Sequence, residues 1–279
     1  MDSMEGPPHK RPRHDSQNGH AQPSSMSLPP LSLSILGVEP LDEFIREIAD
    51  FVHHMIATNM NRISEMPQGT CVEVEAKVGV IKDKMSGQRH QHKHFNTLLN
   101  KLKMSSSQPG YAATPLDYHH LYHIDSFYES RDREKVRVTK EEKTGNVVES
   151  IKKIRLGDLN IYSPKRNADW RVSVNLEVPV PQPSGQPSHT RRKDRLSYTH
   201  EEFSVDLTQV TASNPSGNHG EVLHELELEI VRPELLMYTA SKRGDANAPE
   251  HERNAFDELI RAFVNNARIL VRNASEGWH

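Results

Sequence analysis

The chain contains 279 residues, of which 34% are hydrophobic and 26% are charged, a composition that allows a globular core. Its 35 basic and 38 acidic residues leave a net charge of −3, which excludes the bulk positive charge typical of duplex-binding proteins. A single cysteine, Cys71, excludes an internal disulfide framework and indicates a reducing compartment. No apolar run reaches the roughly 18 to 20 residues of a membrane span and no signal peptide opens the chain. We therefore expect a cytosolic or nuclear protein without membrane contact.

Residues 1–34 are rich in Pro, Ser, His and Gln and contain few aliphatic side chains. This composition predicts a disordered N-terminal tail, followed by one domain over residues 35–279. The segment "HKRPRH", which begins at His9, could be a nuclear-import patch or simply a solvated basic stretch, and both readings stay open.

Two segments show the apolar period of an amphipathic helix. The stripe of the first consists of Leu41, Phe44, Ile45, Ile48, Val52, Met55 and Ile56. The stripe of the second consists of Phe256, Leu259, Ile260, Phe263, Ala267, Leu270 and Val271. Between them, "RHQHKHFNTLLNKL" carries three histidines that could suggest a metal site: His90, His92 and His94. Because no apolar alternation holds them in place, a solvated loop leading to a short helix is favoured.

Eight short runs alternate between apolar and polar residues: "CVEVEAKVGVI", "YHIDSFYE", "KVRVTKE", "NVVESIKKIRL", "DWRVSVNLEV", "RRKDRLSYTH", "EFSVDLTQV" and "EVLHELELEIV". Such alternation predicts half-buried strands. No helix lies regularly between consecutive strands, so the sheet should be mainly antiparallel.

The polar faces of these strands separate by charge. The first and last are mainly acidic, with Glu73 and Glu75 in one and Glu225, Glu227 and Glu229 in the other. An ordinary solvated face would mix signs, because like charges opposite one another destabilise a strand pair. If the first and last strands pair, they crowd carboxylates into one patch and close eight strands into a barrel. Carboxylate ligation of this kind suits Mg²⁺ or Mn²⁺.

The middle strands are mainly basic on the same face, with Lys135, Arg137, Lys153, Arg155, Arg191, Lys193 and Arg195. Basic residues that face metal-binding acids across a barrel interior form a site suited to a polyphosphate. A barrel that merely binds an anion would need the basic strands but not the acids, and it remains a non-catalytic alternative.

The motifs "VEVEAKVG", "KVRVT", "IKKIR", "DWRVSVNLE", "RRKDR" and "HELELEI", in this order, resemble the fungal RNA 5′-triphosphatases. These first enzymes of mRNA capping belong to the triphosphate tunnel metalloenzymes. The resemblance implies a mainly β (α+β) fold, an eight-stranded antiparallel closed barrel with flanking helices. It also implies a nuclear enzyme that uses Mg²⁺ (or Mn²⁺) to hydrolyse the γ-phosphate of triphosphate-ended RNA and leaves a diphosphate end.

The same resemblance assigns roles to residues of this chain. Glu73, Glu75 and Glu229 correspond to direct metal ligands, and Glu227 to an acid of the same cluster. Glu177 matches the acid that orients or activates the attacking water, and Asp206 a water-ordering acid. The phosphate-binding basic positions are Arg137, Lys153, Arg191, Lys193 and Arg195.

The implied partners are triphosphate-ended RNA and the mRNA guanylyltransferase (capping alpha subunit). Yeast members of the family dock that partner through a Trp-containing peptide before the tunnel, whereas the tryptophans here are Trp170 and Trp278. The apolar outer strand faces need cover from the two helices or from a second subunit, which would make a homodimer.

Two enzyme classes compete with this interpretation. Another tunnel-family phosphohydrolase, such as a nucleoside triphosphatase, tripolyphosphatase or thiamine triphosphatase, would share the charge pattern. A cysteine phosphatase is excluded, because its nucleophile opens a C-x₅-R loop, whereas Cys71 is followed six positions on by Lys77 and no Gly-rich cradle is present.

Overall fold

The structure, a computed structural model of the 279-residue chain, describes residue 35 and residues 42–79, 91–129, 135–166, 168–213 and 222–274. The predicted N-terminal tail with its basic patch, the predicted boundary after residue 34, Leu41, His90 and Trp278 lie outside these residues. From residue 42 onward, the described residues belong to one compact unit.

The described residues form five helices: α1 (Glu43–Thr58), α2 (Met60–Ser64), α3 (Gln91–Ser106), α4 (Pro233–Lys242) and α5 (Glu250–Arg272). They form eight strands: β1 (Cys71–Val78), β2 (Asp117–Glu129), β3 (Lys135–Glu141), β4 (Val147–Ile161), β5 (Trp170–Pro179), β6 (His189–His200), β7 (Phe203–Ser213) and β8 (Val222–Ile230). None of these helices combines the length and the apolar character needed to cross a membrane.

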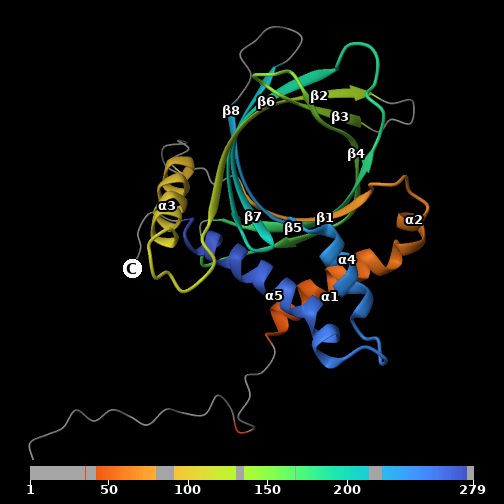
Figure 1. Cartoon of the computed structure of the whole chain (residues 1–279), viewed down its shortest axis with the longest axis vertical. Coiled ribbons are helices and arrows are strands. Elements are labelled where there is room, and N and C mark those ends of the chain that lie inside the picture. Colours follow the sequence, from red (N-terminus) through yellow and green to blue (C-terminus); the bar gives the residue numbers. More distant parts are fainter. Residues whose placement is uncertain are drawn as a thin grey trace, which may run out of the picture. The chain divides into compact units, whose positions relative to one another are not determined.

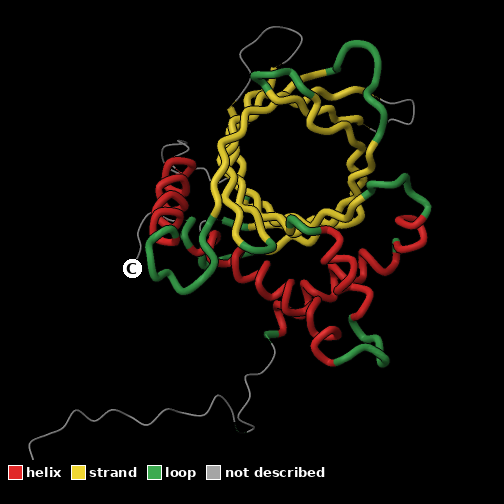
Figure 2. The backbone as a smooth tube through the Cα atoms, viewed as in Figure 1, coloured by secondary structure: helices red, strands yellow, loops and turns green. Residues whose placement is uncertain are grey.

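The strands close into one antiparallel barrel, which appears as a ring in Figures 1 and 2. Around the ring the order is β1-β5-β4-β3-β2-β6-β7-β8, and β8 pairs with β1 to complete it. The predicted mainly β class and the predicted closure of the first strand onto the last are therefore confirmed.

The hydrophobic core lies outside the barrel wall, not within it. Along β5, Trp170, Val172 and Val174 point outward and belong to the buried apolar cluster, whereas Arg171 and Ser173 belong to the opposite, inward face. Helices α1, α4 and α5 pack against one another and against β1, β4 and β8, and they supply the other half of this core. The barrel interior, here called the lumen, is lined mainly by polar residues, with a few apolar side chains such as Ile151 and Val210.

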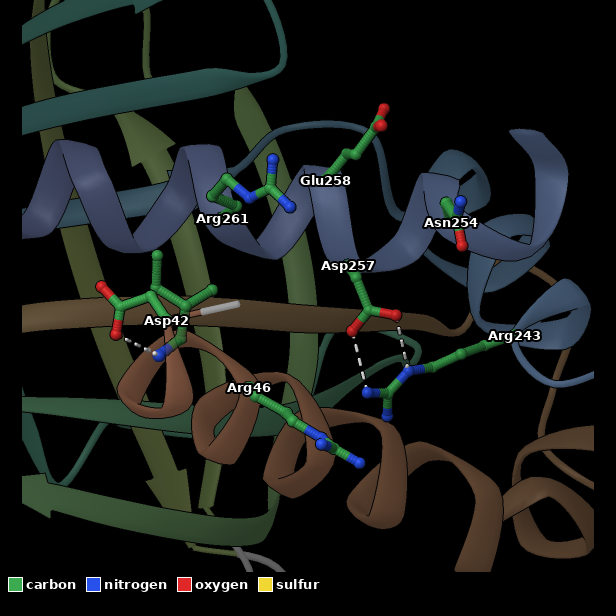
Figure 3. A pocket seen from close by; sticks show the side chains of 8 residues that line it. Asp42, Arg46, Arg243, Asn254, Asp257, Glu258 and Arg261 are labelled. Carbon is green, nitrogen blue, oxygen red and sulfur yellow. Dashed lines mark hydrogen bonds and ion pairs between the residues drawn. The ribbon is translucent and has the colours of Figure 1, made fainter. Parts of the chain in front are cut away.

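Arg243 ties the three covering helices together. Its guanidinium donates to Asp257 of α5 at 2.8 and 3.1 Å and to Asp50 of α1 at 2.6 Å. Figure 3 shows the pair with Asp257 in a cavity of about 500 Å³ that is lined by residues of α1 and α5. Because Arg243 is ion-paired with residues of two helices outside the barrel, we assign this pair of contacts a structural role.

The two predicted amphipathic helices are confirmed as α1 and α5, and every predicted stripe residue of α5 is buried. Helices α2 and α4 were not predicted, because they span only 5 and 10 residues and show no sustained apolar period. The predicted loop before the short helix is wrong from Gln91 onward, where α3 begins. His94 of α3 has a structural contact, since its Nε2 lies 2.8 Å from the backbone oxygen of Asn273.

Strand β4 is longer than its pattern predicted, because a β-bulge between Arg155 and Gly157 reverses the alternation of its side chains. The periodic run stops at Leu156, yet the strand continues to Ile161. A Cβ atom at Gly157 would lie 2.5 Å from the Met55 sulfur of α1, so a larger residue here would force the Met55 side chain to move.

We expect Gly157→Val to lower the free energy of unfolding by about 1–3 kcal/mol, because the added side chain would displace Met55. Urea unfolding of the purified protein would measure the change. Met55→Ala should recover part of this loss in the double variant, since it removes the clashing atoms. Simple additivity of the two single substitutions would contradict a direct contact.

Candidate active site

The pairing of β1 with β8 gathers acidic side chains on one side of the lumen. Glu75 stands opposite Glu229, and Lys77 stands opposite Glu227. Glu73 follows one step further along β1, where it stands opposite Asn175 of β5. Together these residues form what we call the acidic patch: Glu73, Glu75, Glu227 and Glu229. The predicted crowding of carboxylates at the first and last strands is thus what the register produces.

Lys153 of β4 neutralises part of this charge. Its ammonium lies 2.5 Å from Glu73 and 3.4 Å from Glu75. The amide of Asn175 donates a second hydrogen bond to Glu73 at 2.8 Å. Burial, and after it the neighbouring Glu73, still raise the pKa of Glu75 above its usual value.

Glu227 and Glu229 are two residues apart but have opposite electrostatic surroundings. Burial alone would raise the pKa of Glu227, but Lys77 at 2.6 Å and Arg195 at 3.6 Å outweigh it and lower this pKa to about 2. For Glu229, burial and the nearby Glu73 and Glu177 raise the pKa to about 8. Glu229 is therefore the member of the acidic patch whose negative charge is least compensated.

Glu177 of β5 borders the acidic patch and touches the basic side of the lumen. Burial, then the charge of Glu73, raises its pKa to about 7, while Arg137 and Lys153 act in the opposite direction. Arg137 of β3 donates to Glu177 at 3.2 Å and to Glu149 at 2.8 Å. A carboxylate with a pKa near neutrality can accept a proton at physiological pH.

The remaining basic residues come from β6, as predicted, and two of them are held by carboxylates. Lys193 lies 2.5 Å from Asp125 of β2. Arg195 lies 2.9 Å from Asp206 of β7. Arg191 instead has its guanidinium 5.1 Å from the centre of the Phe127 ring, nearer the end of the barrel.

All the predicted site residues lie on the inward faces of their strands, but several lumen acids were not predicted, and Asp125 and Glu149 are the two that contact predicted basic residues. Asp125 is only 1% exposed and accepts from Thr139 at 2.8 Å as well as pairing with Lys193. Glu149 pairs with Arg137. Period-two alternation along β2 places Asp125 on the same face as His123 and Phe127, so the sequence held the signal for this residue.

The donor chemistry of the acidic patch fits a hard divalent cation, because every side chain in it offers carboxylate oxygen. As placed in the described residues, no three acidic, histidine or cysteine side chains converge on one point, and Lys153 lies between Glu73 and Glu75. A cation bound by these oxygens would compete with the Lys153 ammonium for the same negative charge.

Cys71 lies beside this site but is a poor nucleophile. Burial, followed by the charges of Glu177 and Glu73, raises the pKa of its thiol to about 11. The thiol therefore stays protonated near neutral pH, which agrees with the exclusion of a cysteine phosphatase.

Comparison with known proteins gives consistent results. The sequence model of the family described as "mRNA capping enzyme, beta chain" matches residues 84–276. The chain is 31% identical to the mRNA-capping enzyme subunit beta of Schizosaccharomyces pombe over an alignment that covers 90% of this chain and 88% of that protein. It is also similar to the solved structure of the S. pombe Pct1 RNA triphosphatase, with a TM-score of 0.73, 30% identity, and coverage of 89% of this chain and 100% of that one. The same protein in complex with the Spt5 CTD matches with a TM-score of 0.72 and 29% identity, over 89% of this chain and 100% of that one.

We expect Glu229→Gln to raise the melting temperature at pH 9 by roughly 3 to 8 °C when divalent cations are chelated. The raised pKa of about 8 means that ionising Glu229 opposes folding, so its cost appears as the pH rises towards that value and is absent below about pH 4.5. Calorimetry at pH 9 and at pH 5 would measure the difference, with Glu234→Gln on the exposed surface of α4 as the control. An equal effect at both pH values, or a lower melting temperature at pH 9, would contradict the uncompensated charge.

Proposed function

The chain belongs to the family of the mRNA capping enzyme beta chain, and on this premise we propose that its lumen is the active site of an RNA 5′-triphosphatase. The enzyme hydrolyses the bond between the β- and γ-phosphates of triphosphate-ended RNA, and it leaves a diphosphate end and free phosphate. One observation carries this conclusion: carboxylates of β1, β5 and β8 face Arg137, Lys153, Lys193 and Arg195 across one polar lumen.

The basic side chains of the lumen bind and orient the phosphates. Arg137, Lys153, Lys193 and Arg195 are each held in the lumen by a carboxylate partner. Because the donors are fixed in this way, an entering triphosphate finds positive charge already positioned and little reorganisation is needed. Arginine side chains can also bind two phosphate oxygens at once, which fixes the direction of attack.

Glu177 acts as the general base on the attacking water. Its pKa of about 7 leaves a substantial share of the carboxylate ionised at neutral pH, and the ionised group can take the proton that the water loses. Arg137, at 3.2 Å, holds the carboxylate in position and links it to the phosphate-binding side of the lumen.

The family is metal-dependent, and we propose Mg²⁺ (or Mn²⁺) as the cation of this chain. Glu73, Glu75 and Glu229 would hold the metal, with Glu227 in the same acidic patch. When bound, the metal supplies positive charge to the oxygens of the γ-phosphate. Asp206 would help to order water, although its partners in the structure are Arg195 and the hydroxyl of Ser197.

We propose that the chain acts in nuclear mRNA processing, with a guanylyltransferase of the capping apparatus as its partner, because its relatives are capping-enzyme subunits. The Spt5 CTD, which is bound to the solved fission-yeast protein, is a second partner that follows from this kinship. A homodimer stays a prediction, since α1, α4 and α5 already cover the outer faces of β1, β4 and β8.

The first test separates capping from general phosphohydrolysis. With one RNA labelled separately on its β- and γ-phosphates, only γ-label should be released when Mg²⁺ is added, because Glu177 activates the water that attacks the γ-phosphorus. Thin-layer chromatography over time would follow each label. Release of β-label at the same rate, or accumulation of monophosphate ends, would rule out a product that can be capped.

The second test concerns the assigned acids. Glu73→Ala, Glu75→Ala, Glu229→Ala and Glu177→Ala should each reduce γ-phosphate release by about 10²-fold or more, while circular dichroism shows an intact fold. Isothermal titration with Mn²⁺ should show weaker binding in the first three variants and retained binding in Glu177→Ala. Glu234→Ala, on the surface of α4, provides the matched control. Wild-type rates in the four lumen variants would show that the site is misassigned.

A further inference from the structure

The two ends of the barrel differ in charge. Because every strand is antiparallel to its neighbours, one mouth collects the C-terminal ends of β1, β2, β4 and β7 and the N-terminal ends of β3, β5, β6 and β8. Arg171 of β5 lies at this end, which we call the Arg171 mouth. Glu177, near the other end of the same strand, marks the Glu177 mouth.

Several basic residues of the lumen lie on the strand ends at the Arg171 mouth. Their inward faces contribute Lys77, Lys135, Arg171 and Arg191, together with the acids Glu129, Asp158 and Glu225. In the described residues, the inward faces at the Glu177 mouth contribute mainly acids, namely Asp117, Glu141, Glu149, Glu177 and Glu229, with Lys153 standing opposite Glu177. A polyanion would therefore approach through the Arg171 mouth, where the charge is complementary.

A cavity of about 530 Å³ lies at the rim of the Arg171 mouth, where β1, β4, β5 and β8 end or begin. Its apolar wall includes Trp170 and Leu226, and its polar wall includes Asn160 and Arg171. Tyr162, directly after β4, also lines this rim pocket, and it is 76% exposed. An exposed aromatic ring beside an apolar wall and an arginine offers the contacts that a nucleobase and its phosphate use.

Arg171 has binding capacity that the protein does not use. Its Nε is buried and has no hydrogen-bond partner in the described part of the chain, and its nearest carboxylate oxygen, on Asp158, is 3.9 Å away. A buried donor without a partner is costly, and an anionic oxygen would satisfy it. By contrast, the aromatic ring of Phe127 at the same mouth is already stacked on His189 with 4.4 Å between centroids, and Arg191 lies against it.

The chemistry of the proposed reaction points to the same mouth. In an in-line displacement, the attacking water and the leaving oxygen lie on opposite sides of the γ-phosphorus. If Glu177 activates the water, the leaving β-phosphate and the RNA behind it extend away from the Glu177 mouth. Along β1, Glu75 lies three residues, or about 10 Å, from Val78 at the rim. This length leaves room for the β- and α-phosphates before the first nucleoside.

We propose that the rim pocket binds the first nucleoside of the RNA substrate, with its base stacked on Tyr162 and its phosphate contacted by Arg171. This inference rests on the proposed function, since it extends the substrate of that reaction beyond the triphosphate. Tyr162 is then a positioning residue that makes the enzyme prefer an RNA end to a triphosphate without a nucleoside.

Steady-state kinetics with two substrates tests the assignment. For triphosphate-ended RNA, Tyr162→Ala should raise KM by about 5- to 100-fold and leave kcat nearly unchanged, because stacking contributes to binding and not to the chemical step. For inorganic tripolyphosphate, which has no base, Tyr162→Ala should have the same KM and kcat as the wild-type protein. Tyr162→Phe preserves the aromatic ring and should behave as the wild-type protein. Tyr111→Ala serves as a control, because Tyr111 is also exposed but does not line the rim pocket.

A binding measurement gives a readout that does not depend on turnover. An RNA with a β,γ-imido triphosphate and 2-aminopurine as its first base should lose fluorescence on binding to the wild-type protein and to Tyr162→Phe. It should bind Tyr162→Ala and Arg171→Ala about tenfold more weakly, and Tyr162→Ala should also show less quenching.

The outcomes separate the two claims. If the wild-type protein releases phosphate from both substrates but Tyr162→Ala matches it on RNA, the rim-pocket inference alone fails. An equal loss on RNA and on tripolyphosphate would also overturn it, since the residue would then act through the fold. If the wild-type protein releases no phosphate from triphosphate-ended RNA, the proposed function fails and the inference fails with it.

Discussion

The pairing of β1 with β8 is the constraint on which the rest of the structure depends. It closes the barrel, and in doing so it sets Glu75 directly opposite Glu229 in the lumen. Two like charges in such a position oppose folding unless other groups compensate for them. Lys77 and Lys153 supply part of that compensation. The same strand pairing therefore closes the barrel and gathers the carboxylates of the candidate active site.

The fold can accommodate these charges because its apolar core residues and its candidate site residues lie on opposite faces of the same strands. The apolar residues of β1, β5 and β8 face outward and pack under α1, α4 and α5. The lumen can then hold buried ions, because the hydrophobic core does not need that space. A residue change in the lumen should affect ligand binding more than packing, and the reverse should hold for the outer face.

Within the lumen, carboxylate partners hold Arg137, Lys153, Lys193 and Arg195 in position. Lys193 and Arg195 pair with Asp125 and Asp206 from neighbouring strands, so their positions are set before any ligand arrives. The Glu177 mouth is more acidic and the Arg171 mouth more basic, and this difference favours entry of a polyanion through the Arg171 mouth. In the proposed complex, the γ-phosphate of the RNA lies near Glu177 and its first nucleoside lies at the Arg171 mouth.

The sequence by itself determined the number of strands and the inward face of most of them, because side chains alternate along an extended backbone. The roles proposed for the individual acids and bases came from the resemblance of the motifs to a known family. The sequence also determined α1 and α5, whose long apolar stripes repeat over several turns. Only the tertiary structure decided which strands are neighbours, and with them the contacts of Asp125 with Lys193 and of Lys153 with Glu73. It also decided the bulge beside Gly157 and the approach of Met55 to that glycine from another part of the chain. Period-two alternation is a local property of each strand, whereas register and partner choice are set by contacts between residues distant in the sequence.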